Sequence, residues 1–143
     1  MTRQPGRDGR PTSSGSVMRH LIRLRALSVV DCERLSRDFL AQRGAYSARQ
    51  LAEYVADGLQ GQRTTLLAEV QTHIQIAAGL ASASYANAGG WEAWPRFARL
   101  TDLFVVPRLH GNGVGALLIE ALQAEIVRVA DGWVVDPERL PND

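Results

Sequence analysis

The hydrophobic positions along the chain repeat with two different periods, and each change of period marks a new element. Alternation of apolar and polar residues is typical of strands, whereas apolar residues at steps of three and four are typical of helices. The segments that alternate, or that are short and apolar, are 20–27, 64–70, 74–84 and 100–106. The segments with helical spacing are 31–44, 47–59 and 114–129. Strands and helices are therefore both expected.

Two helices are predicted between the first strand and the next one. Asp31 is the expected N-cap of the first helix and Gly44 its end, with an apolar stripe of Cys32, Leu35 and Phe39. Ser47 and Gln50 form a capping box for the second helix, and Gly58 and Gly61 mark its end. Its expected buried side consists of Leu51, Tyr54, Val55 and Leu59.

A hairpin is predicted after these helices. Its strands, 64–70 and 74–84, turn around Gln71-Thr72. Residues 85–99 are expected to form a loop that contains Trp91, Trp94 and Phe97. Large aromatic side chains are costly to expose singly, so these three either pack as a small core or line a pocket.

A strand, a glycine loop and a helix follow one another between Leu103 and Leu122. Gly111, Gly113 and Gly115 stand at alternate positions before the helical pattern. Glycines have no Cβ, so successive backbone N–H groups in such a turn can converge on one anion at the positive end of the helix. The pattern therefore predicts a phosphate or pyrophosphate site.

Two other interpretations of this loop remain. Residues 111–116 also satisfy the dinucleotide-binding pattern G-x-G-x-x-(Gly or Ala), and Asp136 lies about 20 residues further on, as that pattern requires. Against it, Pro107 and the residues after it separate the strand from its first glycine, and little sequence remains after Asp136 for a second half of the sheet. The third interpretation is a turn and helix start that bind nothing.

Residues 105–115, VVPRLHGNGVG, resemble the segment V-x-P-x-x-(Arg or Gln)-G-x-G-(Ile or Val)-G of the GCN5-related N-acetyltransferase (GNAT) family. The resemblance implies an α/β (α+β) fold, with a mixed, mostly antiparallel sheet flanked by helices. In that family the loop wraps the pyrophosphate of acetyl-CoA, and the preceding strand splays from its neighbour and pairs with the pantetheine arm. The residues implied to bind acetyl-CoA are Phe104, Val105, Val106, His110, Gly111, Asn112, Gly113, Val114, Gly115 and Ala116. Only His110 departs from the pattern, which has Arg or Gln at this position, beside the pyrophosphate.

The strand before the loop carries a candidate catalytic base. Its segment resembles amine-directed members of the family, in which an acidic residue occupies the position of Asp102. Alternation puts Asp102 on the same face as Phe104. An ammonium group must lose a proton before it attacks a thioester, and a carboxylate can accept that proton directly or through one water. The alternative is a structural carboxylate that pairs with an arginine.

The resemblance also suggests where an acceptor would bind. In the family the loop between the two early helices borders the acceptor cleft, so Arg43, Tyr46 and Arg49 are candidate substrate contacts, with Trp91 and Trp94 from the later loop. Solvated surface is the alternative for the first three. The function implied is transfer of an acetyl group to a primary amine of a small molecule or peptide. The alternative is a non-catalytic acyl-CoA-binding or interaction module.

The composition of the chain limits the number of domains, the kinds of partner and the kinds of site that it can have. With 143 residues and 15.6 kDa the chain fits one domain, expected over residues 18–143. A disordered leader is expected at 1–17, which is rich in Gly, Pro, Ser, Thr and Arg. A net charge of +1 gives no general attraction to nucleic acid or membranes. The single Cys32 excludes an internal disulfide and fits the cytoplasm. His20, His73 and His110 lie far apart, so no metal site is expected.

The family continues beyond the helix with a strand, a helix whose tyrosine protonates the leaving thiolate, and a closing hairpin. In this sequence only Trp133-Val134-Val135 is a candidate for that strand. A C-terminally truncated version of the fold is therefore expected. Such a fold would leave an open edge on the cofactor-binding strand and favour a homodimer.

Overall fold

A five-stranded sheet divides the protein into layers in the computed structural model, which describes residues 21–43, 46–71, 75–87 and 96–135. The strands lie in the order of the sequence and are β1 (Ile22–Ala26), β2 (Arg63–Gln71), β3 (Gln75–Asn87), β4 (Arg96–Val105) and β5 (Gly132–Val135). All neighbours are antiparallel except β4 and β5, which are parallel. A mixed, mostly antiparallel sheet is thus confirmed. The dinucleotide-binding interpretation is wrong, because it requires a parallel sheet.

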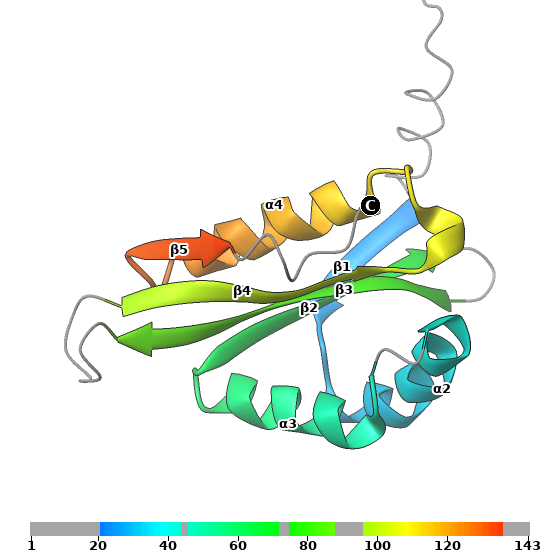
Figure 1. The fold of residues 1–143 in the computed structure, drawn as a ribbon, viewed down its shortest axis with the longest axis horizontal. Coiled ribbons are helices and arrows are strands. Elements are labelled where there is room, and N and C mark those ends of the chain that lie inside the picture. The colour runs from blue at the N-terminus through cyan, green and yellow to red at the C-terminus, as the bar shows by residue number, and fades with distance from the viewer. Residues whose placement is uncertain (1–20, 44–45, 72–74, 88–95, 136–143) are drawn as a thin grey trace, which may run out of the picture.

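Helices cover both faces of the sheet. Helix α2 (Cys32–Arg43) and helix α3 (Ala48–Leu59) lie against one face, and α4 (Val114–Ile126) lies against the other (Figure 1). The described residues also form two short 3₁₀ helices: η1 (Val29–Asp31) precedes α2, and η3 (Pro107–Leu109) follows β4. Among the described residues, no helix is both long and apolar enough to cross a membrane.

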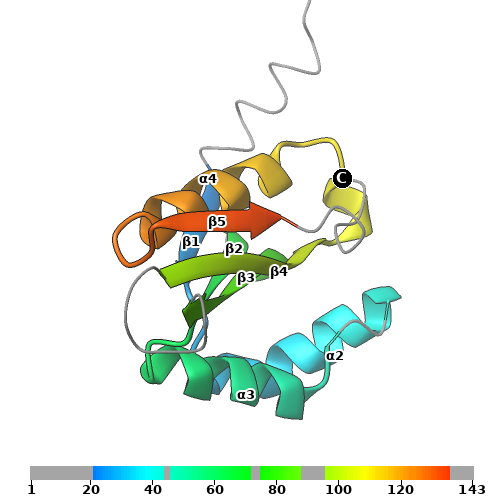
Figure 2. The same ribbon diagram turned by 60° about the vertical axis from the view of Figure 1, so that its left-hand side comes forward.

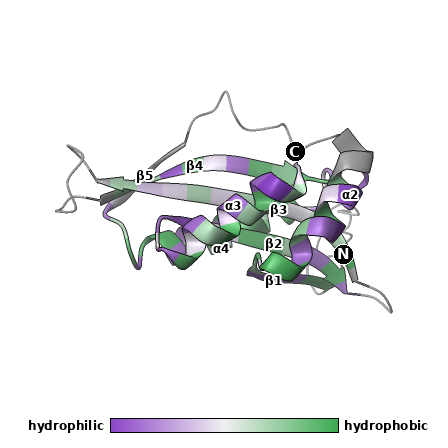
Figure 3. Cartoon of the chain, turned by 90° about the horizontal axis from the view of Figure 1, so that it is seen from below, coloured by the Kyte–Doolittle hydropathy of each residue, from purple (hydrophilic) through white to green (hydrophobic). Residues whose placement is uncertain are grey.

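Each face of the sheet has its own hydrophobic cluster. The cluster under α4 includes Leu66, Leu100, Val105, Leu118 and Leu122. The cluster under α2 and α3 includes Leu35, Phe39, Leu51, Leu67 and Leu80. Figure 3 shows that polar and apolar residues are interleaved along the helices. Because successive strand residues point to opposite faces, β2 contributes Leu66 to one cluster and Leu67 to the other.

The start of α3 is confirmed and part of its predicted buried side is wrong. The Ser47 side chain accepts a hydrogen bond from the Gln50 backbone N–H at 3.0 Å, as expected for an N-cap. Leu51 is fully buried, but Leu59 is 86% exposed. Gly58 takes the inward position of the last turn: a Cβ there would lie 3.4 Å from the Arg63 carbonyl oxygen. Leu59, one residue later, therefore points away from the sheet.

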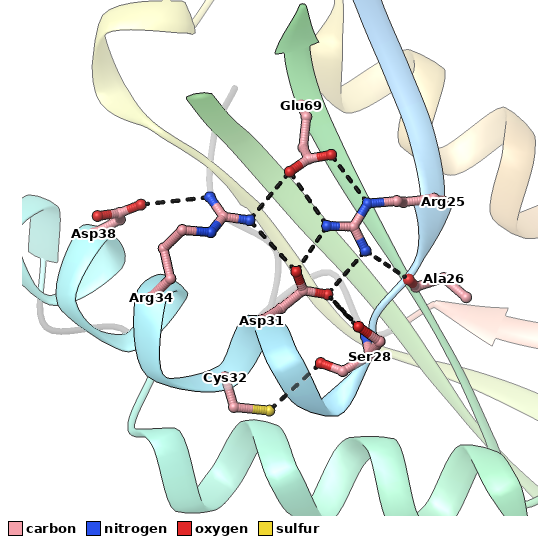
Figure 4. A network of polar contacts seen from close by, with 8 residues as sticks. All are labelled: Arg25, Ala26, Ser28, Asp31, Cys32, Arg34, Asp38 and Glu69. Carbon is pink, nitrogen blue, oxygen red and sulfur yellow. Dashed lines mark hydrogen bonds and ion pairs between the residues drawn. The ribbon is translucent and has the colours of Figure 1, made fainter. Parts of the chain in front are cut away.

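Asp31 is not a simple N-cap, which corrects the sequence prediction. Ser28 precedes η1, and its backbone N–H and its hydroxyl donate to Asp31 Oδ2 at 2.9 and 3.0 Å. Asp31 also accepts from Arg25 at 2.7 and 2.9 Å (Figure 4). Arg25 and Arg34 both reach Glu69 as well, which is fully buried. Two arginines and two carboxylates thus join β1, η1, α2 and β2.

The strands around the predicted loop 85–99 are longer than expected. β3 continues to Asn87 and β4 begins at Arg96, because the two pair as far as Asn87 and Arg96. Trp91 and Trp94 lie outside the described residues. The short apolar run at 133–135 forms most of β5 and pairs with residues 98–100 of β4. The outer edge of β4 is therefore covered over this part, as the candidate strand at 133–135 suggests, and the described part of β5 leaves the rest of that edge open.

Candidate active site

The glycine loop has the backbone conformation that its sequence suggests. Gly111 and Gly113 adopt φ angles of 85° and 83°, in the left-handed region that side chains other than glycine rarely occupy. A Cβ built on either glycine would meet no atom of the described residues within 4 Å. The described part of the chain therefore leaves room for a group that approaches the backbone at both glycines.

No side chain among the described residues caps the N-terminus of α4. Gly113 is its N-cap residue, and the first intrahelical hydrogen bond runs from the Leu117 N–H to the Gly113 carbonyl oxygen at 3.1 Å. The N–H groups of residues 113–116 precede that bond, so they are the donors that a helix leaves without an intrahelical acceptor. Donors at the positive end of a helix dipole, beside an open glycine turn, fit a phosphate group.

The strand that leads into this loop is paired only in part on its outer side. The register of β4 with β5 runs from Phe97 opposite Gly132 to Leu100 opposite Val135. β4 itself continues to Val105, and the described part of β5 does not reach that far. Figure 2 shows β5 alongside β4, on the side of α4. Residues 101–105 therefore present an outer edge that β5, as far as it is described, leaves uncovered.

A β-bulge changes the direction of the side chains in this part of β4. Ser82 pairs with Asp102 and Ala83 with Leu100, so Thr101 is an extra residue. Before the bulge, Ala98 and Leu100 pack in the cluster under α4, and after it Val105 does the same. Without the bulge Asp102 would share that face with Leu100. The extra residue instead turns Asp102 toward α2 and α3, on the same face as Phe104, as predicted.

Three hydroxyl groups surround the Asp102 carboxylate. Tyr54 donates to its two oxygens at 2.8 and 2.9 Å, and Tyr46 donates to Oδ2 at 3.2 Å. Thr101 donates to Oδ1 at 2.7 Å. Burial, followed by the nearby charge of Asp102, raises the pKa of both tyrosines above the usual value. Both phenols therefore remain protonated near neutral pH and act as donors to the carboxylate.

Arg63 reaches this cluster from the first position of β2. Its Nη1 donates to the hydroxyl oxygens of Ser82 and Thr101, both at 2.8 Å, and its guanidinium lies 4.1 Å from the centre of the Tyr54 ring. Since arginine can only donate, the Thr101 oxygen accepts from Arg63 and its own proton is free to point at Asp102. In the described structure the arginine acts on Asp102 through a threonine, and the direct arginine pair considered from the sequence does not form.

The other predicted contacts lie in different places. Tyr46 is buried beside Asp102, so it is not part of the solvated surface, the alternative considered for it. Arg49 has a 91% exposed side chain whose ionic contact is Glu53 at 3.9 Å, so it belongs to the solvated surface. Arg43 ends helix α2, and its side chain lies outside the described part. Trp91 and Trp94 are also outside it.

Sequence reasoning missed Tyr54, Thr101 and Arg63 as members of the site. Tyr54 was identified only as part of a buried helix face, and Arg63 was not identified at all. Tyr54 and Asp102 are 48 positions apart, and Arg63 and Thr101 are 38 apart. No local pattern marks such pairs.

His110 folds back onto the end of β4. Its Nε2 lies 2.8 Å from the Val105 carbonyl oxygen. A carbonyl oxygen can only accept, so Nε2 carries a proton and donates it. Asn112, between the glycines, uses its backbone N–H within the turn, where the Leu109 carbonyl oxygen accepts it at 3.3 Å.

Metal ligands and a reactive thiol are not evident in the part of the chain that the structure describes. No group of three His, Cys, Asp or Glu side chains there could hold a metal ion. Cys32 is buried, and burial raises the pKa of its thiol. A buried thiol with a raised pKa is a poor nucleophile.

Solved structures share this fold. An acetyltransferase from Trypanosoma brucei is 23% identical, with a TM-score of 0.60 over 80% of this chain and 82% of its own. Glucosamine-6-phosphate N-acetyltransferase from Arabidopsis thaliana is 14% identical, with a TM-score of 0.63 over 80% and 81%. An acetyltransferase from Vibrio fischeri is 13% identical, with a TM-score of 0.64 over 85% and 98%. No family model matches the sequence, and no curated protein is significantly similar to it. At these identities the likeness concerns the fold, which is that of the acyl-CoA N-acyltransferases.

Proposed function

We propose that this chain, which has the GNAT acetyltransferase fold, is an acetyl-CoA-dependent N-acetyltransferase whose acceptor is a primary amine of a small molecule or peptide. The observation that carries the proposal is the arrangement along β4. The strand holds Asp102 beside two tyrosines and then runs into an uncapped helix N-terminus through Gly111 and Gly113. A candidate base and a candidate anion site are thus joined by one short stretch of backbone.

The loop residues fit the phosphate end of coenzyme A. Open space over Gly111 and Gly113 and the N–H groups of residues 113–116 are suited to a pyrophosphate. The uncovered edge of β4 is suited to an extended arm that hydrogen-bonds with the strand as an added strand would. One solved structure of the same fold, an aminoglycoside N-acetyltransferase, carries coenzyme A. That structure supports coenzyme A as the ligand here.

Asp102 is suited to proton transfer at the acceptor. Acetyl-CoA supplies an activated acyl group, and the amine nitrogen forms a bond to the acetyl carbon as the carbon–sulfur bond breaks. Coenzyme A leaves as the thiolate, which takes up the second proton that the nitrogen loses as the amide forms. The amine must be neutral to react, so its proton has to leave first. The Asp102 carboxylate lies on the face of β4 next to the uncovered edge and can take that proton directly or through Tyr54, whose hydroxyl touches it.

A second candidate function has its own supporting observation. Both oxygens of Asp102 already accept hydrogen bonds from hydroxyl groups of the chain. A carboxylate satisfied in this way also suits a structural role, as in a non-catalytic acyl-CoA-binding module. The two functions share the loop and differ in turnover.

The test measures binding and turnover on the same protein. Calorimetry with coenzyme A, acetyl-CoA and NAD tests the loop, and we expect the first two to bind and NAD not to. Release of free thiol from acetyl-CoA, followed with a panel of primary amines, tests turnover. Binding without thiol release for any amine supports the binding module. Binding of NAD without coenzyme A overturns both candidates.

A further inference from the structure

The outer edge of β4 next to the loop carries one backbone acceptor whose direction is fixed by the pairing with β3. The Val106 N–H donates to the Ala78 carbonyl oxygen of β3 at 2.9 Å. In an antiparallel pair, residues alternate between those whose N–H and C=O face the partner strand and those whose groups face away. Val105 precedes Val106, so its carbonyl group faces away from β3, toward the outer edge.

The close approach of Gly79 to the backbone of β4 agrees with this outward direction of the Val105 carbonyl group. Gly79 stands opposite Val105 in the register, and a Cβ on it would overlap the carbonyl oxygen of Phe104. The Phe104 carbonyl therefore faces β3, and the next one, on Val105, faces outward. The described part of β5 pairs only as far as Leu100, so it does not reach this outward carbonyl.

The side chain of His110 forms a hydrogen bond to this outward carbonyl oxygen of Val105. The ring Nε2 donates to the Val105 oxygen at 2.8 Å, a normal hydrogen-bond length, after the chain has turned back through η3. His110 is itself on the surface. An exposed side chain can leave such a contact for other rotamers, because a hydrogen bond near the surface is largely replaced by one to water.

We propose that His110 is a latch on the cofactor edge: its ring occupies the Val105 carbonyl, and an extended ligand that pairs with this end of β4 must displace it. The proposal rests on the proposed function, because it takes the ligand's extended arm to be that of coenzyme A. It assigns His110 to the arm of the ligand, whereas the sequence pattern assigned this position to the phosphates. Competition of this kind lowers the affinity for a ligand with the arm and leaves a ligand without it unaffected.

The expected size follows from the exchange of one hydrogen bond. Removing the ring frees the acceptor, so coenzyme A should bind about two- to tenfold more tightly, the range that one net hydrogen bond supplies. ADP carries a pyrophosphate but no pantetheine arm, and its affinity should stay within about twofold. The ratio of the two affinities is therefore the quantity that reports on the latch.

The experiment compares His110→Ala with the unmodified protein by calorimetry, using coenzyme A and ADP. His110→Gln is the rescue variant, because its amide N–H can donate to the same carbonyl, and it should restore the original ratio. Arg108→Ala is the matched control. Arg108 is also exposed and lies in the same turn, and its substitution removes a charge, so the affinities for coenzyme A and ADP should change alike. Thermal melts confirm that all three variants fold.

The outcomes separate the proposal from the function on which it rests. If His110→Ala weakens coenzyme A and ADP in parallel, the ring contacts the phosphates and the latch is overturned. An unchanged ratio with coenzyme A bound also overturns the latch and leaves the proposed function standing. If neither protein binds coenzyme A, the proposed function fails and the latch fails with it. If only the variant binds coenzyme A, both stand.

Discussion

A substitution at Gly113 gives the most direct test of the anion site. Gly113 has a φ of 83° and faces open space at the N-terminus of α4. Asn and Asp are the side chains that best tolerate the left-handed region, and they have nearly the same shape. Gly113→Asp and Gly113→Asn therefore place the same atoms over the loop and differ mainly by one negative charge.

The size of the charge effect follows from the geometry of the loop. A carboxylate on Gly113 would stand about 4–6 Å from an anion held by the neighbouring N–H groups, and two like charges at that distance in a partly solvated site repel by about 1–3 kcal/mol. That range corresponds to a loss of affinity of about 5- to 150-fold for Asp relative to Asn. The stability of the fold should not follow the same ranking: Gly113→Asp should be at least as stable as Gly113→Asn, because a negative charge at a helix N-terminus is stabilising.

Calorimetric titration of coenzyme A into the two variants measures the difference, and thermal melts record their stability. Gly61→Asn is the matched backbone control. Gly61 has a φ of 74° and also faces open space, but it lies in the turn between α3 and β2. Gly61→Asn should lose about as much stability as Gly113→Asn and keep the affinity of the unmodified protein for coenzyme A. Equal affinities for Gly113→Asp and Gly113→Asn would show that no anion binds beside this residue.

Three further predictions concern the rest of the site and the frame that holds it. Asp102→Asn should lower acetyl transfer by about 100-fold or more while coenzyme A binds as before, and unchanged turnover would exclude Asp102 as the base. Hydrogen bonds from Arg25 hold the pKa of Asp31 well below its usual range, so its stabilisation is complete above about pH 4 and is lost as the pH falls toward the native pKa. The melting temperature should therefore fall more steeply between about pH 7 and pH 3 for the unmodified protein than for Asp31→Asn, and parallel curves of melting temperature against pH would contradict this role. Gly79→Ala should destabilise the fold by about 2–4 kcal/mol in urea unfolding, because its Cβ would overlap a backbone oxygen, whereas Gly61→Ala should cost about 1 kcal/mol; similar losses would refute the close approach of β3 and β4.

The features that the sequence predicted well depend on near neighbours. The N-cap at Ser47, the stripe from Cys32 to Phe39 and the glycine turn each involve residues that lie within one or two turns of backbone. For such features local propensity and spacing decide the structure. The strand at 133–135 also formed as a short apolar run suggests, although its parallel pairing with β4 depends on the whole sheet.

The features that the sequence could not predict depend on contacts between distant segments. Asp31 has the residue type and position of an N-cap. In the folded chain, however, it pairs with Arg25 and belongs to an ion cluster with Glu69, which lies 38 positions further along the chain. Leu59 follows the helical period, but Gly58 faces the sheet in the last turn of α3. In both cases tertiary packing overrides a correct local pattern.

The bulge at Thr101 shows how the core and the site constrain one another. Leu100 and Val105 both pack under α4, although they are five positions apart and regular alternation would place them on opposite faces. One extra residue between them corrects the phase, so the core requires a bulge somewhere in this interval. Its position at Thr101 leaves Asp102 on the face of the tyrosines and gives it a neighbouring hydroxyl that Arg63 orients. The same irregularity that lets β4 fill the core under α4 therefore also builds the candidate base on the opposite face.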